Sequence, residues 1–262
     1  MRLKVAIITC LLAFPVLAAC QTAADINFTD QQGRKQGHWI KKYPNQNIMY
    51  EGVFKDDHPV GEFRRYNEDK SIKSVLIYSE DGKNADATIF HTNGNIFAQG
   101  KYLNQMKEGK WRFFSPTDSV YLVCEEEYSK NIRNGKSVNF YPDGTVAERI
   151  NFVNNKRQGE WLQYYPDGKT FLKSYYKDGL LNGTMEVWFE SGILQVAGNY
   201  KNNMREGHWH FFDANGKLKY ELDYVNGITK NRQMDIDVSN LIESLEKNSG
   251  KVTDPEKSWD IL

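Results

Sequence analysis

The chain has 262 residues, with 34 basic and 34 acidic side chains, so its formal net charge at pH 7 is zero. This balance excludes bulk electrostatic attraction to nucleic acid as the main mode of binding. Charged residues make up 26% of the chain and the mean hydropathy is −0.67, which indicates that much of each structural element faces water.

The first residues have the pattern of a secretory signal peptide. Arg2 and Lys4 are basic, and an apolar run follows over residues 5–16. A helix of about 12 residues spans only ~18 Å, well short of a ~30 Å hydrocarbon core, which argues against a transmembrane anchor. We therefore predict a signal peptide over residues 1–19. Its removal leaves 32 basic and 34 acidic side chains, a net charge of −2.

Cys20 follows the small-residue end of this segment, Leu17-Ala18-Ala19. The arrangement resembles the lipobox of bacterial lipoproteins, which implies that Cys20 is acylated and becomes the mature N-terminus. Several acyl chains, at ~0.8 kcal/mol per buried CH₂, hold a protein firmly on a membrane. Gln21 in place of aspartate points by family rules to the outer membrane, on its periplasmic or cell-surface face. Residues 20–33 are expected to form a lipidated tether.

Residues 34–231 carry a repeat with a period of 24 residues, and one unit has two extra residues. Its marker is a glycine that recurs at Gly37, Gly61, Gly109, Gly135, Gly159, Gly183 and Gly207. At two places in this series the glycine is replaced, by Ala85 and by Asn231. Five residues later the chain is aromatic in every unit after the first: Tyr66, Phe90, Phe114, Phe140, Tyr164, Trp188 and Phe212. A fixed period of this length is typical of small stacked units.

Each unit has the pattern of a β-hairpin. An aromatic-rich run leads into a turn such as Pro142-Asp143-Gly144 or Pro166-Asp167-Gly168, and a second run ends in an aromatic residue before a polar connecting loop. Eight hairpins fit between Arg34 and Asn231, although Lys70 stands where the second unit should have its turn glycine. We predict an all-β fold, an elongated array of about eight stacked antiparallel β-hairpins with a short C-terminal helix.

Tryptophan recurs two residues after the marker, at Trp39, Trp111, Trp161 and Trp209. In an ideal strand this place and the fifth place after the marker lie on opposite faces. Either both faces carry aromatic rows or a bulge turns one row inward. The tryptophans are therefore candidates both for packing between hairpins and for an interaction surface that binds protein, glycan or peptidoglycan.

The run Gly-x-Trp-x-x-Tyr/Phe-Tyr-Pro-Asp/Asn-Gly, with its aromatic after the second strand and its polar connection, resembles the MORN-repeat family. The similarity is to the divergent bacterial form of the YwqK type, which is labelled as an antitoxin. The best copies are residues 159–176 and 207–224. The resemblance implies serial β-hairpins in a rod or curved ribbon, with no cofactor, no catalytic residues and no single ligand. Eukaryotic relatives are linked to membranes and protein scaffolding.

The chain offers no pattern of catalytic residues, phosphate-binding loop or metal motif. His208 and His210 share one face of a strand, but the sequence places no further ligand near them, so we predict no metal site. Cys124 follows Tyr121-Leu122-Val123 and is expected to be a small buried residue. We predict a protein that is not an enzyme and needs no cofactor.

Residues 232–262 are predicted to form a capping helix and tail. Val238, Leu241, Ile242 and Leu245 make a helical apolar stripe, with Ser239 or Asp237 as N-cap and Asn248-Ser249-Gly250 as the stop. The helix either docks on the last hairpin, near Phe212 and Tyr224, or recruits a partner with Trp259, Ile261 and Leu262 as further contacts.

These features together indicate a lipid-anchored cell-envelope protein that acts as a protein–protein interaction scaffold. The partner is expected to be another envelope protein and not nucleic acid. A module that binds glycan or peptidoglycan through the tryptophans and a periplasmic immunity protein against a toxin are the alternatives.

Overall fold

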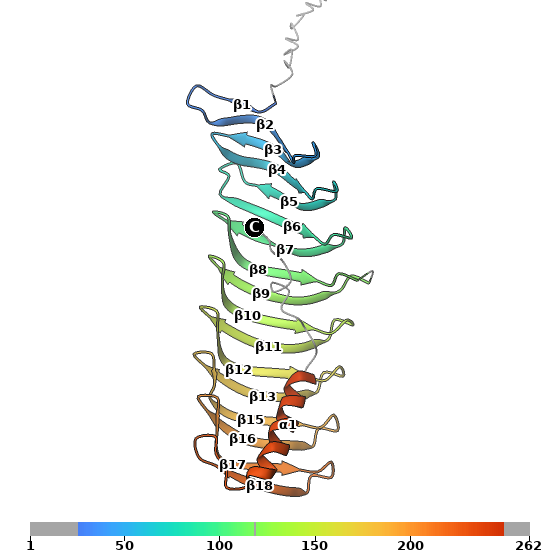
Figure 1. Cartoon of the computed structure of the whole chain (residues 1–262), viewed down its shortest axis with the longest axis vertical. Coiled ribbons are helices and arrows are strands. Elements are labelled where there is room, and N and C mark those ends of the chain that lie inside the picture. Colours follow the sequence, from blue (N-terminus) through green and yellow to red (C-terminus); the bar gives the residue numbers. More distant parts are fainter. Residues whose placement is uncertain (1–25, 118, 249–262) are drawn as a thin grey trace, which may run out of the picture.

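The computed structural model describes residues 26–117 and 119–248 (Figure 1). The N-terminal half of the array contains the strands β1 (Phe28–Thr29), β2 (Lys35–Lys42), β3 (Ile48–Lys55), β4 (His58–Tyr66), β5 (Ile72–Tyr78), β6 (Asn84–Phe90), β7 (Ile96–Leu103), β8 (Met106–Phe114) and β9 (Leu122–Ser129). The other half contains β10 (Ile132–Phe140), β11 (Val146–Val153), β12 (Lys156–Tyr164), β13 (Thr170–Lys177), β14 (Leu180–Leu181), β15 (Gly183–Trp188), β16 (Leu194–Lys201), β17 (Met204–Phe212), β18 (Leu218–Tyr224) and the helix α1 (Arg232–Asn248).

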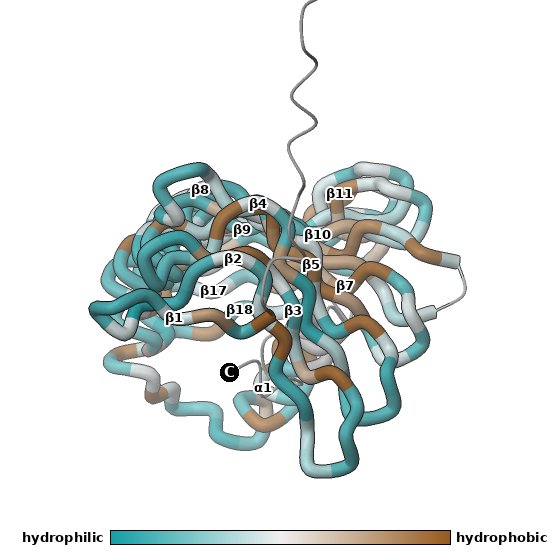
Figure 2. The backbone as a smooth tube through the Cα atoms, turned by 90° about the horizontal axis from the view of Figure 1, so that it is seen from above, coloured by the Kyte–Doolittle hydropathy of each residue, from teal (hydrophilic) through white to brown (hydrophobic). Residues whose placement is uncertain are grey.

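The strands form one long open sheet in which each strand pairs antiparallel with the next along the chain, and both β14 and β15 pair with β13. The strands lie across the long axis of the molecule, and α1 runs along that axis over the last hairpins (Figure 1). Seen along the axis, the hairpins stack on one another and bend toward the side of α1 (Figure 2). We call this side the inner face and the opposite side the outer face. The predicted all-β array of eight hairpins is confirmed.

The hairpin turns explain why the chain folds as a continuous meander. At one side of the sheet Gly144 and Gly168 close the predicted turns at φ of +87° and +83°, and Lys70 adopts +73° in the same place without being a glycine. At the other side the connections predicted as loops are tight two-residue turns. Asn154-Asn155 and Asn202-Asn203 have φ between +50° and +65° at all four residues, the signature of a hairpin turn that matches strand twist.

The repeat glycine makes a bulge in the sheet. In the β7–β8 pair, Gln99 faces Arg112 and Lys101 faces Glu108, so the three residues from Gly109 on oppose the single Gly100. Gly109 itself has a φ of +67°, which a side chain would strain. The period of the marker glycine is therefore the period of a bulge, which sets the bend of the strand and is absent from the β5–β6 pair, where Ala85 replaces the glycine.

Valine at Gly168 should lower the free energy of unfolding by on the order of 1 kcal/mol or more, because a β-branched residue resists positive φ. Nothing lies within 4 Å of the added Cβ, so the loss comes from the backbone alone. Asparagine, which tolerates this conformation, is the matched control and should cost less. Urea unfolding of both variants measures the difference, and equal stabilities would contradict the proposed turn.

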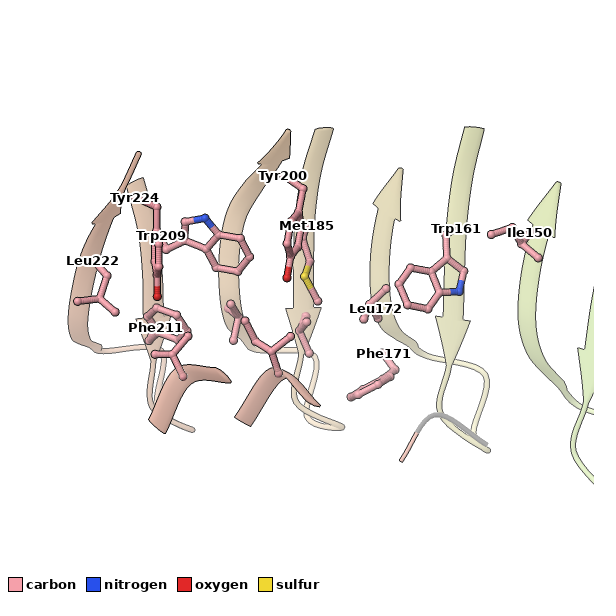
Figure 3. Packing of buried hydrophobic residues seen from close by; sticks show 14 of the residues in the cluster. Ile150, Trp161, Phe171, Leu172, Met185, Tyr200, Trp209, Phe211, Leu222 and Tyr224 are labelled. Atoms are coloured by element: carbon pink, nitrogen blue, oxygen red, sulfur yellow. The ribbon is translucent and has the colours of Figure 1, made fainter. Parts of the chain in front are cut away.

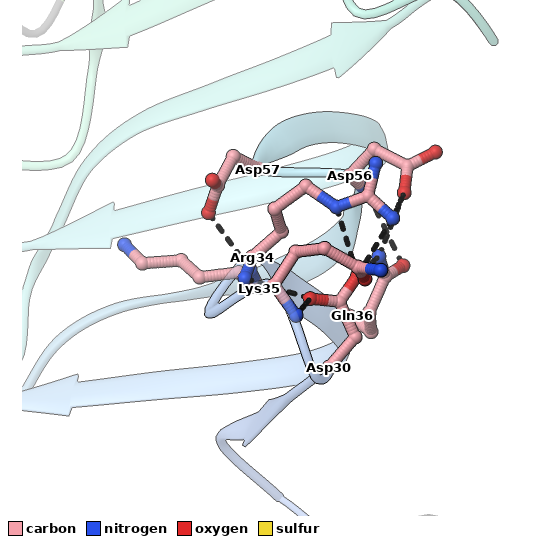
Figure 4. A network of polar contacts seen from close by, with 7 residues as sticks. Asp30, Arg34, Lys35, Gln36, Asp56 and Asp57 are labelled. Carbon is pink, nitrogen blue, oxygen red and sulfur yellow. Dashed lines mark hydrogen bonds and ion pairs between the residues drawn. The ribbon is translucent and has the colours of Figure 1, made fainter.

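The N-terminal edge of the sheet is closed by a polar network (Figure 4). Arg34 Nε donates to Asp30 Oδ2 at 2.8 Å, and the Arg34 guanidinium also pairs with Asp56 at 3.0 Å. Gln36 Nε2 donates to both carboxylates, at 3.0 Å to Asp30 and 2.8 Å to Asp56. These bonds tie the segment before β2 to the turn between β3 and β4, and so shield an edge that could otherwise pair with another chain.

The pKa of Asp30 gives a test of this network. Desolvation alone would raise that pKa, but hydrogen bonds from the Arg34 amide and from the side chains of Gln36 and Arg34 prevail and lower it from 3.8 to about 2. Since the unfolded chain binds the proton at higher pH, the stabilisation is present above the unfolded pKa and is lost as the pH falls toward 2. NMR titration of the Asp30 carboxyl should show this low value, and a midpoint near 3.8 would contradict the network.

Most of the buried apolar side chains form two clusters on the inner face. The first cluster extends over β11–β18 and includes Trp161, Leu172 and Trp209 from the strands together with Val238 and Ile242 of α1 (Figure 3). The second cluster lies on β6–β9: Ala87, Ile89, Phe97, Ala98, Trp111, Phe113, Cys124 and Tyr128. The prediction that Cys124 is a small buried residue is confirmed.

The helix α1 docks on the array as predicted, but it begins earlier. Its N-cap is Asn231, whose Oδ1 accepts the Met234 amide at 3.2 Å, so the prediction of Ser239 or Asp237 was wrong. The apolar stripe alone could not reveal the start, because the first turns of the helix lie before it. Arg205 of β17 instead binds Ser239 Oγ at 3.2 Å and Asp235 Oδ1 at 2.8 Å.

Tyr224 of β18 is a second anchor for the helix. Its hydroxyl donates to Asp235 Oδ1 at 2.8 Å, and burial together with this bond raises the pKa of Tyr224 to about 12. The phenol therefore stays a donor at neutral pH. The helix was predicted to dock near Phe212 and Tyr224; Tyr224 belongs to the first cluster with Val238 and Ile242 of α1, but Phe212 does not. Within the described part of the chain, no helix combines the length and apolar character needed to cross a bilayer.

Candidate interaction surface

Three of the four tryptophans proposed as an interaction surface lie in the interior. The exposed fractions of Trp111, Trp161 and Trp209 are 0%, 5% and 0%, and Trp39 is half-buried. Their ring nitrogens are also satisfied inside the sheet: Trp111 Nε1 donates to Lys101 O at 3.1 Å and Trp209 Nε1 to Asn199 O at 3.2 Å. Of the two alternatives for the tryptophans, packing between hairpins is the one that Trp111, Trp161 and Trp209 follow, and the candidate interaction surface is corrected for these three rings.

A glycine on the preceding strand makes room for each fully buried ring. A Cβ on Gly100 would lie 2.3 Å from the Trp111 ring, and one on Gly198 would lie 2.1 Å from the Trp209 ring. Both glycines precede their tryptophan by 11 residues, a signal that the sequence contains and that predicts ring-on-backbone packing. The bulge turns the tryptophan inward over that glycine, while the aromatic residue five places after the marker sits half-buried at the turn.

The outer face carries charged side chains in cross-strand pairs. Lys173 Nζ lies 3.1 Å from Glu160, and Lys101 Nζ lies 3.5 Å from Asp86. Such pairs are solvated and contribute little to stability, about 0–1 kcal/mol each. The outer face is therefore free to vary in charge without loss of the fold, which is the property that a recognition surface needs.

The outer face is hollowed at β6–β8. The hollow is open to solvent and has a volume of about 400 Å³; its lining residues are Asp86, Ala87, Thr88, Gln99, Gly100, Lys101, Lys110 and Arg112. It lies beside the one unit in which Ala85 replaces the marker glycine and β5 pairs with β6 without a bulge. The β5–β6 pair is regular, whereas the β7–β8 pair contains a bulge, which bends the strand. The hollow lies where these two kinds of pairing meet.

Three residues that line this hollow are cations, Lys101, Lys110 and Arg112, and each of them pairs with a carboxylate. Lys110 Nζ and Arg112 Nε both contact Glu125, at 2.9 and 2.8 Å. Partial burial of Glu125 opposes its ionisation, but the hydrogen bonds from Arg112 and Lys110 outweigh it and lower the pKa of that carboxyl. Glu125 therefore holds the two cations in fixed positions above the strands. The arrangement suits hydrogen bonding to polar and anionic groups of a partner.

The two neighbouring histidines face carboxylates on the next strand. His208 pairs with Asp223, and His210 Nε2 lies 3.7 Å from Glu221. The sequence analysis considered only residues close to the histidines in the chain and therefore missed these carboxylates. Antiparallel pairing brings residues that are 11 to 15 positions apart side by side. Among residues 26–117 and 119–248, no three His, Cys, Asp or Glu side chains are placed to hold a metal ion.

Replacing His208 and His210 by glutamine together should leave the melting temperature unchanged, with or without a chelator. Both side chains lie on the solvated outer face, so little free energy depends on them. Calorimetry of the wild type and the double variant measures this, and a melting temperature of the wild type that falls on adding chelator would reveal a metal.

A family model described as a MORN repeat variant matches four consecutive segments, residues 133–154, 157–178, 181–202 and 205–226. No curated protein matches the chain significantly. One solved structure, "Crystal Structure of TcdB2-TccC3", aligns with 9% identity and a TM-score of 0.21 over 77% of this chain and 12% of that chain, too slight a likeness to bear on function. Cys20 lies outside the described residues. The matched segments coincide with successive hairpins, so the region from β10 to β18 contains four tandem hairpin repeats that are similar to the MORN repeat variant.

Proposed function

We propose that the protein is a non-enzymatic scaffold of the cell envelope that binds another envelope protein through the outer face of its sheet. The observation that carries this proposal is the division between the two faces. Three of the four tryptophans of the repeat are buried on the inner face, whereas the outer face presents rows of charged side chains and the hollow at β6–β8. An elongated repeat surface is suited to contacts with large partners.

The protein's place in the cell follows from the lipobox at Cys20, which supports attachment to the outer membrane by acyl chains. In this arrangement residues 20–33 tether the array, and the repeats extend from the membrane. The lipid fixes one end of the rod, so its long outer face remains accessible to a partner in the same compartment. Binding of glycan through the tryptophans loses its basis, since three of the four rings are buried.

Serine in place of Cys20 tests the anchor. The variant should accumulate as an uncleaved precursor or disappear from the outer-membrane fraction, because it lacks the thiol that receives the lipid. Fractionation of cells followed by mass determination of the protein measures both. A variant that is matured and fractionates like the wild type would show that the anchor is wrong.

Charge reversal at the hollow tests the scaffold. The double variant Lys110→Glu and Arg112→Glu should lose a co-purifying envelope protein, and the matched double variant Lys217→Glu and Lys219→Glu, exposed near the turn into β18, should retain it. Circular dichroism checks that both variants fold. Retention of the partner by both variants would place its contact elsewhere. Binding of the wild type to purified peptidoglycan, with no protein partner, would favour a cell-wall module instead.

A further inference from the structure

We propose that the inner face at β10–β12 is a binding site for a primary ammonium or guanidinium group, with Glu148 and Gln163 as its acceptors. The site lies at the N-terminal end of the first cluster, on the face opposite to the hollow. This inference concerns the inner face and does not depend on the function proposed for the outer face.

A departure from the repeat marks this site. Four residues after the marker position, four units have a buried apolar residue on the inner face: Ile89, Phe113, Val187 and Phe211. The two units in the middle of this series have Asn139 and Gln163 instead. Strand pairing places Glu148 of β11 directly opposite both of these side chains, so three polar residues form a row across three neighbouring strands. Polar side chains in core positions cost stability, and such departures are typical of functional sites.

Glu148 has neutral hydrogen-bond donors but no counter-ion. Its Oε1 accepts from Trp161 Nε1 at 2.6 Å and from Gln163 Nε2 at 3.3 Å, and its Oε2 accepts from Asn139 Nδ2 at 2.6 Å. No Lys, Arg or His in the described part of the chain forms an ion pair with Glu148, whereas Glu125 on the outer face pairs with two cations. The half-buried carboxylate of Glu148 therefore favours a ligand of positive charge.

Gln163 adds an acceptor that nothing among the described residues satisfies. The residue is 4% exposed, and its Oε1 is buried without a hydrogen-bond partner. The bond from Nε2 to Glu148 fixes the amide, so Oε1 lies near the carboxylate that lacks a counter-ion. The opposite amide orientation would set Oε1 against that carboxylate and leave the amino group unpaired. Buried acceptors normally have a donor, and we assign the missing donor to a bound ligand.

The two acceptors together define the chemical class of this ligand. Ammonium and guanidinium groups are positively charged and carry several N–H donors and no acceptor, so one group can donate to Gln163 Oε1 and also neutralise Glu148. A water molecule could donate to Gln163 but would leave the charge of Glu148 uncompensated. Asn139 and Glu148 are only half-buried, so the row can be reached from solvent. The group can belong to a small free amine or to a Lys or Arg side chain of another protein.

Titration of the full chain with n-butylammonium, followed by NMR through the indole N–H of Trp161, tests the site. This N–H donates to Glu148, so its signal should shift saturably as the ligand binds. Tetramethylammonium, which has the same charge but no N–H donor, should cause no such shift. Glu148→Gln should weaken binding on the order of tenfold or more, whereas the same change at Glu186, on the outer face, should not. A missing shift, or equal binding by the Glu148→Gln variant, overturns the proposal.

The change Gln163→Val separates binding from a purely structural function of the polar row. Valine is the residue that the next unit has in this position, at Val187, so the variant should melt no lower than the wild type. It should nevertheless lose affinity for n-butylammonium on the order of tenfold, because an acceptor of the ligand is removed. A variant that melts at a clearly lower temperature, or that keeps the wild-type affinity, overturns the proposal, since Gln163 would then serve the fold.

A short peptide with one lysine among alanines distinguishes the two sources of the ligand. Tighter binding of this peptide than of n-butylammonium would assign the site to a side chain of a partner protein, and equal or weaker binding would assign it to a free amine. The same peptide with its lysine acetylated should not bind, because acetylation removes the charge. Equal affinities of the acetylated and unmodified peptides overturn the proposal.

Discussion

Alanine in place of Trp209 should lower the free energy of unfolding by about 3–5 kcal/mol, the range measured for loss of large buried aromatic side chains. The ring is fully buried and packs against Tyr200 and Tyr224, with ring centroids 5.2 and 6.0 Å away. It also covers the backbone of Gly198, so its removal leaves a cavity between two hairpins.

Trp39 is the matched control, since it occupies the same place in the first unit but is only half-buried. Its replacement by alanine should cost clearly less. Urea unfolding followed by circular dichroism gives both values. Equal losses at Trp39 and Trp209 would be inconsistent with a core that is concentrated on the inner face under α1.

Removal of residues 235–262 should produce the other large effect, a lower melting temperature together with self-association. Val238 and Ile242 would leave the first cluster, each contributing about 1.5–3 kcal/mol by burial. The truncated array would also expose apolar side chains on its inner face, which promotes aggregation. Calorimetry and sedimentation measure the two effects. A truncated protein that is monomeric with an unchanged melting temperature would contradict the capping function of α1.

Point variants of the same helix separate docking from chain length. Ile242→Asp places a carboxylate in the core, whereas Ile236→Asp places it at a position that is 55% exposed. The first change should be strongly destabilising and the second nearly neutral, because only the first buries an unpaired charge. Similar melting temperatures for the two variants would mean that α1 does not dock through the Val238–Ile242 side.

The local pattern predicted most of this fold. The period of 24 residues and the turns at Gly144 and Gly168 depend on chemistry within a few residues, and so does the apolar stripe of α1. The direction of the tryptophans could not be obtained in this way, because it depends on the bulge at the marker glycine and on a partner strand. The glycines at positions 100 and 198 show which ring is accommodated, but only after the strand register is known.

The candidate surface was harder to predict for the same reason. The hollow at β6–β8 combines Asp86, Lys101 and Arg112 from three strands, and no spacing along the chain brings them together. The hollow lies beside Ala85, where the sequence departs from the repeat by replacing the marker glycine. In this chain the departure from the repeat is a better guide to the hollow than the repeat itself. Asn231 similarly occupies a marker slot, yet serves as the N-cap of α1.

Site-specific photocrosslinking in intact cells tests the division between a structural inner face and a binding outer face most directly. A photoreactive residue at Lys110 or Lys173 samples the outer face, and one at Asn203 samples a two-residue turn at the side of the sheet. We expect an adduct with one envelope protein from Lys110 and Lys173 but not from Asn203. Adducts formed only from Asn203, with none from the two outer-face positions, would contradict the account.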